Sequence, residues 1–276
     1  EMRTKASFMD PFPFSKPTLR DAVKAIENAT NDNRVRGIVV SVKSGGVALP
    51  HTQEIRKALS KFKESGKFTK IYAPSYSGNG LGLYYFASAF DEIWMQPVGQ
   101  LTMTGMNMEM PFGKEALDKL GVNPDFFQRE GFKSAMENLT NSKMSAKNRE
   151  MLSSIVDDLS KQMVTQVAKD REVSPAFIKQ KVDLGLLTGR EALDAKLVDR
   201  LDYVDVLASE IRQATMGDPE DENLKFILLG QYAQAKKTPS TPAEPAQSTK
   251  SNIALIYAVG TIVDETGNGG SAGADD

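Results

Sequence analysis

The sequence predicts an α/β fold with parallel strand connections. Short runs of β-branched and aromatic residues alternate with segments of helical periodicity between residues 18 and 95. Alternation at this pace is typical of strand–helix–strand units, in which the helix returns the chain so that the next strand runs parallel. Beyond residue 140 the pattern becomes mainly helical, so an additional helical segment is expected.

Each expected element has a local signature. The strands are short apolar runs, expected as buried strands at 37–42, 71–73 and 93–95. The helices have apolar residues at helical spacing or a capping residue at the start. They are expected after Thr18, through Ile55–Phe62, through Tyr84, after Ser145, after Ser174, after Thr188 and, as the last one, through Val204–Ile211. On the helix after Ser145, one face is expected to bury Leu152, Ile155, Val156, Leu159 and Met163. The Gly-rich stretch YSGNGLG (76–82) lacks the spacing of a phosphate loop, so it predicts close backbone packing at a strand–helix turn.

Composition shifts predict four segments along the chain. Residues 1–140 are expected to form an α/β core, and residues 141–235 a helical extension that completes this first unit. Residues 236–250, KKTPSTPAEPAQSTK, contain three prolines and no large apolar residue, which is typical of a linker or exposed loop. Residues 251–276 return to strand character in NIALIYAVGTIVD, which suggests the start of a truncated second unit.

The composition excludes several classes of function. The net charge of −2 over 276 residues gives no electrostatic attraction toward nucleic acid. The sequence contains no run of 18 apolar residues that could span a membrane, so the chain given is expected to be soluble. No cysteine is present, which excludes thiol catalysis, thiolate zinc sites and disulfides. His51 is the single histidine and is interpreted as a surface or capping residue rather than a catalytic base. No cofactor and no metal are expected.

The segment FFQREGFKSAMENL (126–139) places one lysine, Lys133, in a run that is expected to be half-buried. The apolar residues around it in sequence are Phe126, Phe127, Phe132, Ala135, Met136 and Leu139. A lysine amine acts as a base only when neutral, and burial or a neighbouring cation such as Arg129 favours that form, whereas Glu130 and Glu137 oppose it. The alternative is a lysine that extends to solvent along an apolar surface.

Two further segments are candidates for a site. Ser44-Gly45-Gly46 follows an expected strand, where successive glycine amides form an anion nest or oxyanion hole, or else a simple turn. No motif marks Ser44 as a nucleophile. A methionine-rich stretch could line an apolar groove or fill the core, and consists of Met103, Met106, Met108 and Met110.

Residues 131–137, GFKSAME, resemble the "GxYKSAxEP" segment of the signal peptide peptidase A (protease IV) family. Other segments are similar to the same family in the same order, namely VRGIVVSVKSGG, KESGKF, YYFASAFDEIWMQPVGQL and TGREALDAKLVD. QYAQAKKTP followed by NIALIYAVGTIVD resembles the family's junction between two tandem repeats, so the chain resembles the N-terminal repeat of the long form. The resemblance covers about residues 17–265.

The resemblance implies a ClpP/crotonase-like fold of repeated β-β-α units arranged as a superhelix, and a serine–lysine dyad. In the long form the lysine belongs to the first repeat and the serine to the second. Lys133 therefore matches the general base, whereas Val47 or Ala48 stands where the nucleophile would be in this repeat. The resemblance implies a nucleophile outside this chain, so this fragment alone is expected to be inactive.

The resemblance also implies the surroundings of the enzyme. Its substrates would be cleaved signal peptides, which are apolar, and its assembly a homo-oligomer, a tetramer for the double-repeat form. The family is anchored in the cytoplasmic (inner) membrane by an N-terminal helix that this chain lacks, with the catalytic body on the extracytoplasmic side.

Two alternatives remain open from the sequence. The repeat could be a non-catalytic structural or scaffolding unit with a crotonase-like fold, which the absence of a nucleophile after Ser44 favours. It could also be an acyl-CoA enzyme of that fold, which would bind acyl-CoA instead of reacting with a serine-directed probe. Turnover by this chain alone would instead point to a serine within it, such as Ser44 or Ser134.

Overall fold

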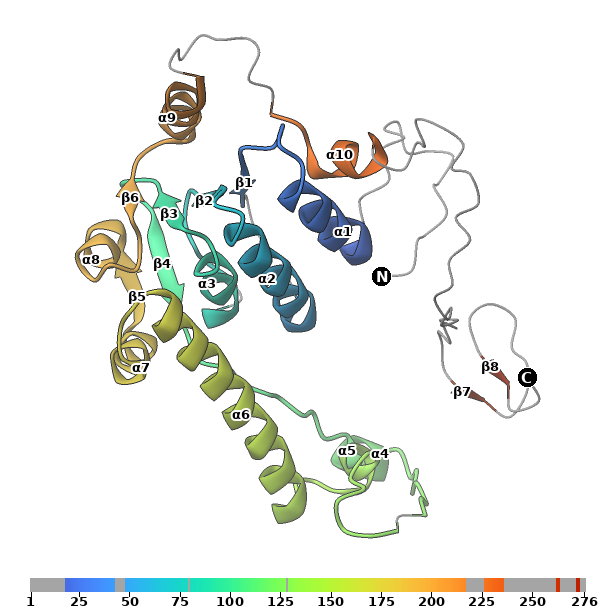
Figure 1. The fold of residues 1–276 in the computed structure, drawn as a ribbon. Helices are drawn as coiled ribbons and strands as arrows, with labels where there is room; N and C mark the ends of the chain where they lie inside the picture. The colour runs from blue at the N-terminus through green and yellow to red at the C-terminus, as the bar shows by residue number, and fades with distance from the viewer. Residues whose placement is uncertain are drawn as a thin grey trace. The chain divides into compact units, whose positions relative to one another are not determined.

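The centre of the fold is a parallel sheet of four strands in the order β1-β2-β3-β6 (Figure 1). The computed structural model describes residues 18–42, 48–78, 80–127, 129–216, 226–235, 262–263 and 272–273. The strands are β1 (Gly37–Ser41), β2 (Phe68–Ala73), β3 (Glu92–Met95), β4 (Gln100–Met103), β5 (Gly185–Thr188), β6 (Arg200–Leu201), β7 (Ile262–Val263) and β8 (Ala272–Gly273). β4 and β5 form a separate antiparallel pair, so the described fold is mixed α/β.

Helices cover both faces of the parallel sheet, as expected for strands joined by crossovers. They are α1 (Leu19–Thr30), α2 (Leu49–Lys63), α3 (Leu81–Ala87), α4 (Lys114–Lys119), α5 (Glu137–Thr140), α6 (Ala146–Asp170), α7 (Pro175–Leu184), α8 (Gly189–Asp194), α9 (Val204–Met216) and α10 (Leu229–Ala235). Side chains alternate across the sheet: Ile71 and Ile93 join the main apolar core with α3 and α6, whereas Tyr72 and Trp94 pack with α9. A further cluster joins α1, α2 and α10.

The capping residues predicted from the sequence begin the helices at the expected places. Thr18 and Thr188 each form a capping box, with the acidic residue three positions later bonded back to the cap. Ser145 and Ser174 cap α6 and α7 through their hydroxyl groups. Gly80 has a φ of +48°, and a Cβ there would lie 2.8 Å from Thr104 O, so the prediction of close backbone packing is confirmed.

Several sequence-based expectations were wrong in detail. β1 is half-buried rather than buried, because among the described strands it lies at the end of the sheet and pairs on one side only. No sequence pattern indicated β4, β5 or β6, which are two to four residues long, and α9 is not the last of the described helices because α10 follows it. The superhelix of repeated units stays a prediction, since the described residues do not test it.

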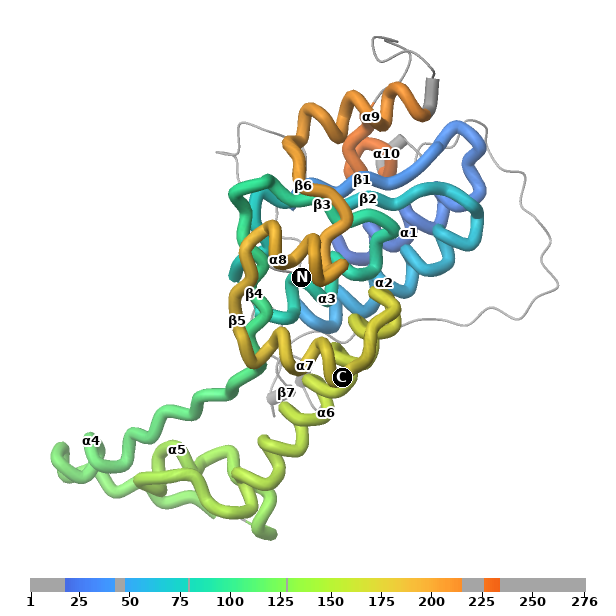
Figure 2. The backbone as a smooth tube through the Cα atoms, turned by 90° about the vertical axis from the view of Figure 1, so that its left-hand side faces the viewer, coloured from blue at the N-terminus to red at the C-terminus, as the bar shows by residue number. Residues whose placement is uncertain are grey.

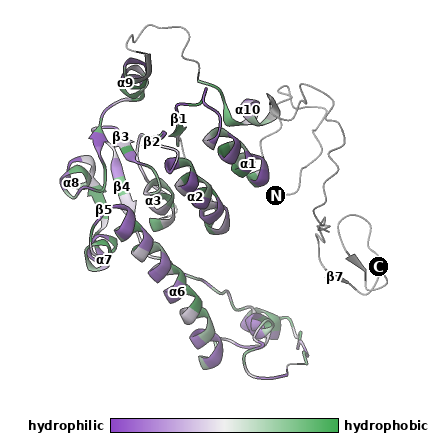
Figure 3. Cartoon of the chain, in the orientation of Figure 1, coloured by the Kyte–Doolittle hydropathy of each residue, from purple (hydrophilic) through white to green (hydrophobic). Residues whose placement is uncertain are grey.

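The first half of α6 does not bury its apolar face, contrary to expectation. Its buried apolar residues begin only at Met163, and Ile155 is 44 % exposed. Figure 2 shows why: α4, α5 and the N-terminal part of α6 lie away from the sheet. Residues 104–127 and 129–162 are called the arm below. Figure 3 shows hydrophobic residues along the arm as well as in the sheet region, so hydropathy alone does not distinguish the two.

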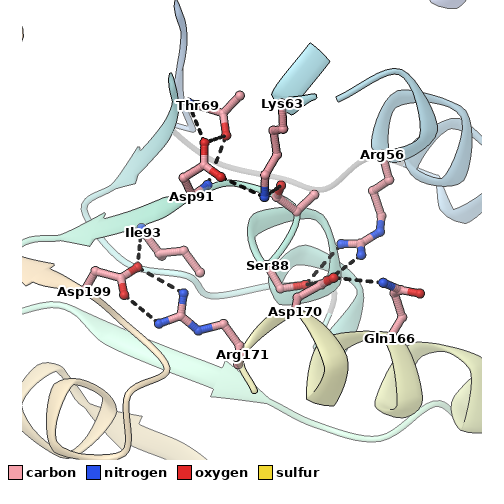
Figure 4. Close-up of polar contacts among 11 residues, drawn as sticks. Arg56, Lys63, Thr69, Ser88, Asp91, Ile93, Gln166, Asp170, Arg171 and Asp199 are labelled. Atoms are coloured by element: carbon pink, nitrogen blue, oxygen red, sulfur yellow. Dashed lines mark hydrogen bonds and ion pairs between the residues drawn. The ribbon is translucent and has the colours of Figure 1, made fainter. Parts of the chain in front are cut away.

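The C-terminal end of α6 is held in the core by polar contacts (Figure 4). Asp170 Oδ2 accepts hydrogen bonds from Arg56 Nη2 at 2.5 Å and from Ser88 Oγ at 2.8 Å, and its Oδ1 accepts one from Gln166 Nε2 at 2.8 Å. Arg56 also donates to Tyr85 O and lies over the Tyr85 ring. This buried network connects α2, α3 and α6.

The chain divides into two units, Glu1–Ala235 and Lys236–Asp276. In the second unit the described residues form one parallel pair, β7 and β8. Most of the strand predicted at 252–264 and the whole linker predicted at 236–250 lie outside the described residues. The boundary predicted at residue 140 coincides with the end of α5 and stays a prediction.

Candidate functional site

Lys133 lies in the arm, between a turn at residues 130–133 and the short helix α5. Lys133 N–H donates to Glu130 O at 3.4 Å, and Glu130 has a φ of +70°, in the left-handed region. The Lys133 side chain is exposed. The expected burial of Lys133 is therefore wrong for the chain as it stands, although Ser134 and Glu137 of the same segment are buried.

The exposure has a structural cause. The aromatic residues near Lys133 extend into solvent rather than over it: Phe126 is 41 % exposed, Phe132 51 %, and Phe127 is fully exposed. Lys147 Nζ, from the first turn of α6, lies 5.6 Å from the centre of the Phe132 ring. Since the arm lies away from the sheet, the strands and the helices that cover them do not bury these rings (Figure 2).

One carboxylate close to Lys133 is buried, and it bonds to the start of α6. Glu137 Oε1 accepts from Ser145 Oγ at 2.6 Å, and Glu137 Oε2 accepts from Ser145 N–H at 3.2 Å and from Asn148 Nδ2 at 3.0 Å. Glu137 is 5 % exposed and Asn148 1 %. Glu137, Ser145 and Asn148 are called the latch below.

The environment of Glu137 favours its charged form. The hydrogen bond from the Ser145 hydroxyl is the main cause that lowers the Glu137 pKa, and burial acts against it more weakly. A carboxylate at the N-terminus of a 25-residue helix also interacts favourably with the helix dipole. The sequence-based interpretation missed this cluster, because it considered Glu137 only as a charge beside Lys133. The sequence did indicate Ser145 as a helix cap. Its contact with Glu137, eight residues earlier, follows no local spacing and could not be predicted.

Ser134 and Asn138 flank the same segment. Ser134 is buried and its carbonyl accepts from Glu137 N–H at 3.1 Å. Asn138 Oδ1 is buried with no hydrogen-bond donor among the described residues. A buried acceptor in this state is uncommon in a complete structure, and it lies next to the latch.

The other predicted site residues do not gather around Lys133. Ser44, Gly45, Gly46 and Val47 lie outside the described residues, and Ala48 is the residue before α2. His51 is half-buried in the first turn of α2 and is not the capping residue of that helix.

The predicted methionine groove is not formed in the described part of the chain. Met103 is fully buried in the main core, as the core-filling alternative expected. Met106 and Met108 are exposed on the arm, whereas Met110 accepts a hydrogen bond from Asn148 through its sulfur at 3.4 Å. The stretch therefore divides between the core and the arm.

The described residues form neither a metal site nor a helix that could span a membrane. No group of three or more His, Asp or Glu side chains is placed to hold a metal ion there. No helix described here, α6 included, has both the length and the apolar character needed to cross a bilayer.

Residues 61–216 match the family described as Peptidase family S49. The chain belongs to peptidase family S49. The matched range contains the sheet strands β2 and β3, the arm with Lys133, and the whole latch. The resemblance to signal peptide peptidase A noted from the sequence is thus confirmed at the level of the family.

Known S49-type proteases are similar over most of this chain. Protease 4 of Salmonella typhi is 33 % identical over 268 residues, which are 94 % of this chain and 41 % of that protein. Protease 4 of Haemophilus influenzae is 29 % identical over 92 % of this chain and 42 % of that protein. Serine protease SPPA, chloroplastic, of Arabidopsis thaliana is 26 % identical over 85 % of this chain and 33 % of that protein. The chain spans about two fifths of the length of the two bacterial relatives.

Proposed function

We propose that this chain is the N-terminal repeat of a membrane-associated serine endopeptidase that degrades cleaved signal peptides, with Lys133 as the general base. Membership of peptidase family S49 supports the peptidase class. The GFKSAME segment supports the choice of Lys133, because it resembles the lysine motif of that family. The nucleophilic serine would belong to a second repeat, which is consistent with relatives that are more than twice as long.

The exposure of Lys133 is the observation that shapes this proposal. An amine in water is protonated at neutral pH and cannot accept a proton. A base at this position therefore needs a covering surface that excludes water and favours the neutral amine. The exposed rings of Phe126, Phe127 and Phe132 would form an apolar rim once a second repeat, or a neighbouring copy in a tetramer, covers the arm.

The chemistry of the proposed dyad follows from a neutral Lys133 Nζ. It would accept the proton of the serine hydroxyl while the oxygen attacks the peptide carbonyl. The ammonium would then give its proton to the leaving amine, which leaves an acyl-enzyme. Lys133 would next accept a proton from water as that water attacks the ester, and return it to the serine oxygen as the ester bond breaks.

The apolar character of the arm suits the proposed substrate. Met106 and Met108 are exposed on the same segment as Phe126 and Phe127, and such side chains accept apolar peptides of varied shape. We place the enzyme at the cytoplasmic membrane, through an anchor outside this chain, with the catalytic body on the extracytoplasmic side.

The test uses the intact protein with its second repeat and an apolar peptide substrate. Lys133→Ala is expected to lower kcat by about 10²–10⁴-fold, the usual contribution of general acid–base catalysis. Lys143→Ala is the matched control, because Lys143 is also an exposed lysine of the arm, and it is expected to leave kcat unchanged. Full activity in Lys133→Ala would reject the general-base role.

The structural alternative is a repeat that has the fold but no chemistry. The exposure of Lys133 in this chain is the observation that favours it. It predicts that Lys133→Ala and Lys143→Ala behave alike, and that a serine-directed probe labels the intact protein equally with and without Lys133.

A further inference from the structure

The Lys133 loop is held by buried polar groups in a part of the molecule that lacks an apolar core. In the arm, the described residues that are buried are Ser134, Glu137 and Asn148, all of them polar. α5 has only four residues and no side-chain cap, so it gains little stability from its own hydrogen bonds. The position of this segment therefore depends on specific bonds more than on packing.

We propose that Glu137 is the positioning residue for Lys133, an inference that rests on the proposed function of Lys133 as a base. Three residues lie between Lys133 and Glu137 in the sequence, and they include the turn from Ser134 O to Glu137 N–H (3.1 Å). Ser134 is buried, so this turn has little freedom to absorb a movement of Glu137. A displacement of Glu137 would therefore also displace the backbone of Lys133, the residue before Ser134.

The strength of the latch comes from charge and from the helix that it joins. Glu137 receives its three hydrogen bonds as a carboxylate, and hydrogen bonds to a charged acceptor are stronger than neutral ones. Two of them come from Ser145, which caps α6, and α6 is fixed at its other end by the Arg56–Asp170 pair. Glu137 thereby connects the Lys133 loop to the longest rigid element of the described fold.

Other contacts of the segment do not replace the latch. Gly113 N–H donates to Asn138 O at 2.7 Å. This bond is on the C-terminal side of Glu137, whereas Lys133 is on its N-terminal side, and it joins two backbone groups without fixing a side chain. Met136 and Phe132 are about half exposed. Phe132 meets α6 through the Lys147 amine, 5.6 Å from its ring centre, and a cation–π contact at an exposed site contributes only about 0.5–1 kcal/mol. Loss of the Glu137 carboxylate would therefore release the loop while α6 keeps its own anchor.

Glu191 provides a matched control for a purely structural effect. It too accepts hydrogen bonds from a helix cap, from Thr188 Oγ1 and Thr188 N–H at 2.8 Å each, and its pKa is likewise lowered by these bonds. It belongs to α8, outside the arm. If carboxylates at helix starts act only on stability, Glu137→Ala and Glu191→Ala will affect the enzyme alike.

The experiment compares Glu137→Ala, Glu137→Gln, Glu191→Ala and Lys133→Ala in the intact protein, with an apolar peptide as substrate. Glu137→Ala is expected to lower kcat by roughly 10- to 100-fold with KM changed less than about twofold, since a small misplacement of a catalytic group has effects of this size. Glu137→Gln is expected to recover part of the loss, because its carbonyl oxygen still accepts from Ser145. Glu191→Ala is expected to keep full kcat.

A second readout, amide hydrogen exchange of residues 131–136, does not depend on catalysis. Glu137→Ala is expected to accelerate it by at least about tenfold relative to Glu191→Ala, because local opening follows the loss of the bonds that hold a segment. If Glu137→Ala fails to fold, Ser145→Ala, which removes the 2.6 Å bond and keeps the backbone donor, takes its place.

The outcomes separate the two proposals. Full kcat in Glu137→Ala together with an inactive Lys133→Ala overturns the positioning role and leaves the proposed function standing. Full activity in Lys133→Ala overturns the proposed function. Amide hydrogen exchange of residues 131–136 then remains as the test of whether Glu137 fixes the Lys133 loop. Unchanged exchange at residues 131–136 overturns the latch in either case.

Discussion

The sheet region and the arm bury opposite kinds of residues. Around the sheet, the buried side chains are mainly large and apolar, with Ile71, Ile93 and Trp94 fully enclosed. In the arm, the buried residues described are polar, whereas Phe127 and Phe132 are exposed. The sheet region is therefore stabilised mainly by apolar packing, whereas the arm is held mainly by specific hydrogen bonds and keeps apolar side chains exposed.

The two ends of α6 show the same contrast within one helix. At its C-terminal end, Asp170 accepts a hydrogen bond from Arg56, and the nearby residues Val164 and Val167 of the same helix belong to the main apolar core. At its N-terminal end, Ser145 and Asn148 bond to Glu137 with little apolar cover. α6 thus connects the apolar core, at its C-terminal end, to the Lys133 segment, whose buried residues are polar.

The largest expected difference is between phenylalanines of the two regions. Phe62→Ala is expected to lower the free energy of unfolding by about 3–5 kcal/mol, because Phe62 is fully buried and its removal leaves a cavity. Phe127→Ala is expected to change it by less than about 0.5 kcal/mol, since its ring is in solvent. Urea unfolding of this chain measures both, and equal losses would remove the distinction between the regions.

The core anchor of α6 is expected to have the next largest effect. Asp170→Ala leaves Arg56 buried without its ionic partner, which costs about 3 kcal/mol or more. Asp158→Ala is the control on the same helix, since Asp158 is exposed and bonds only to Gln162 among the contacts described. This variant is expected to change the free energy of unfolding by less than about 0.5 kcal/mol. Similar urea midpoints for the two variants would contradict the anchor.

A helix cap outside the arm should matter less. Thr188→Ala removes the hydroxyl that completes the capping box of α8 and is expected to destabilise the chain by about 1 kcal/mol. The fall in thermal midpoint measures it. A fall as large as that of Asp170→Ala would show that α8 is more central to the core than its contacts indicate.

Acid should affect the arm before the sheet. Because its pKa is lowered in the folded chain, Glu137 contributes its full stabilisation above about pH 4.5, the ordinary value for Glu, and loses it as the pH falls through the depressed pKa. Exchange protection of residues 131–148, corrected for intrinsic rates, should therefore decrease below that pH while β2 and β3 keep theirs. Simultaneous loss in both regions would contradict a separate arm.

Elements with local signals could be predicted from the sequence, and those with non-local causes could not. Thr18 and Thr188 mark helix starts through contacts three residues away, so both capping boxes were found. β4 and β5 pair across more than eighty residues and gave no such signal.

The same distinction holds for the candidate site. Lys133 was identified from a motif, but its exposure depends on the direction of the whole arm. The Glu137–Ser145 contact joins residues eight apart across a loop, and no periodic pattern encodes it.

The proposed role of Lys133 as a base requires that the exposed face around it becomes covered in the intact protein. Hydroxyl-radical footprinting of Phe127 and Phe132, in this chain and in the intact protein, tests it directly, with the fully buried Phe62 as the control for folding. We predict strong oxidation of both rings in this chain, strong protection of both in the intact protein, and protection of Phe62 in each. Equal oxidation of Phe127 and Phe132 in the two forms would show that Lys133 stays in water, and would contradict its role as a base.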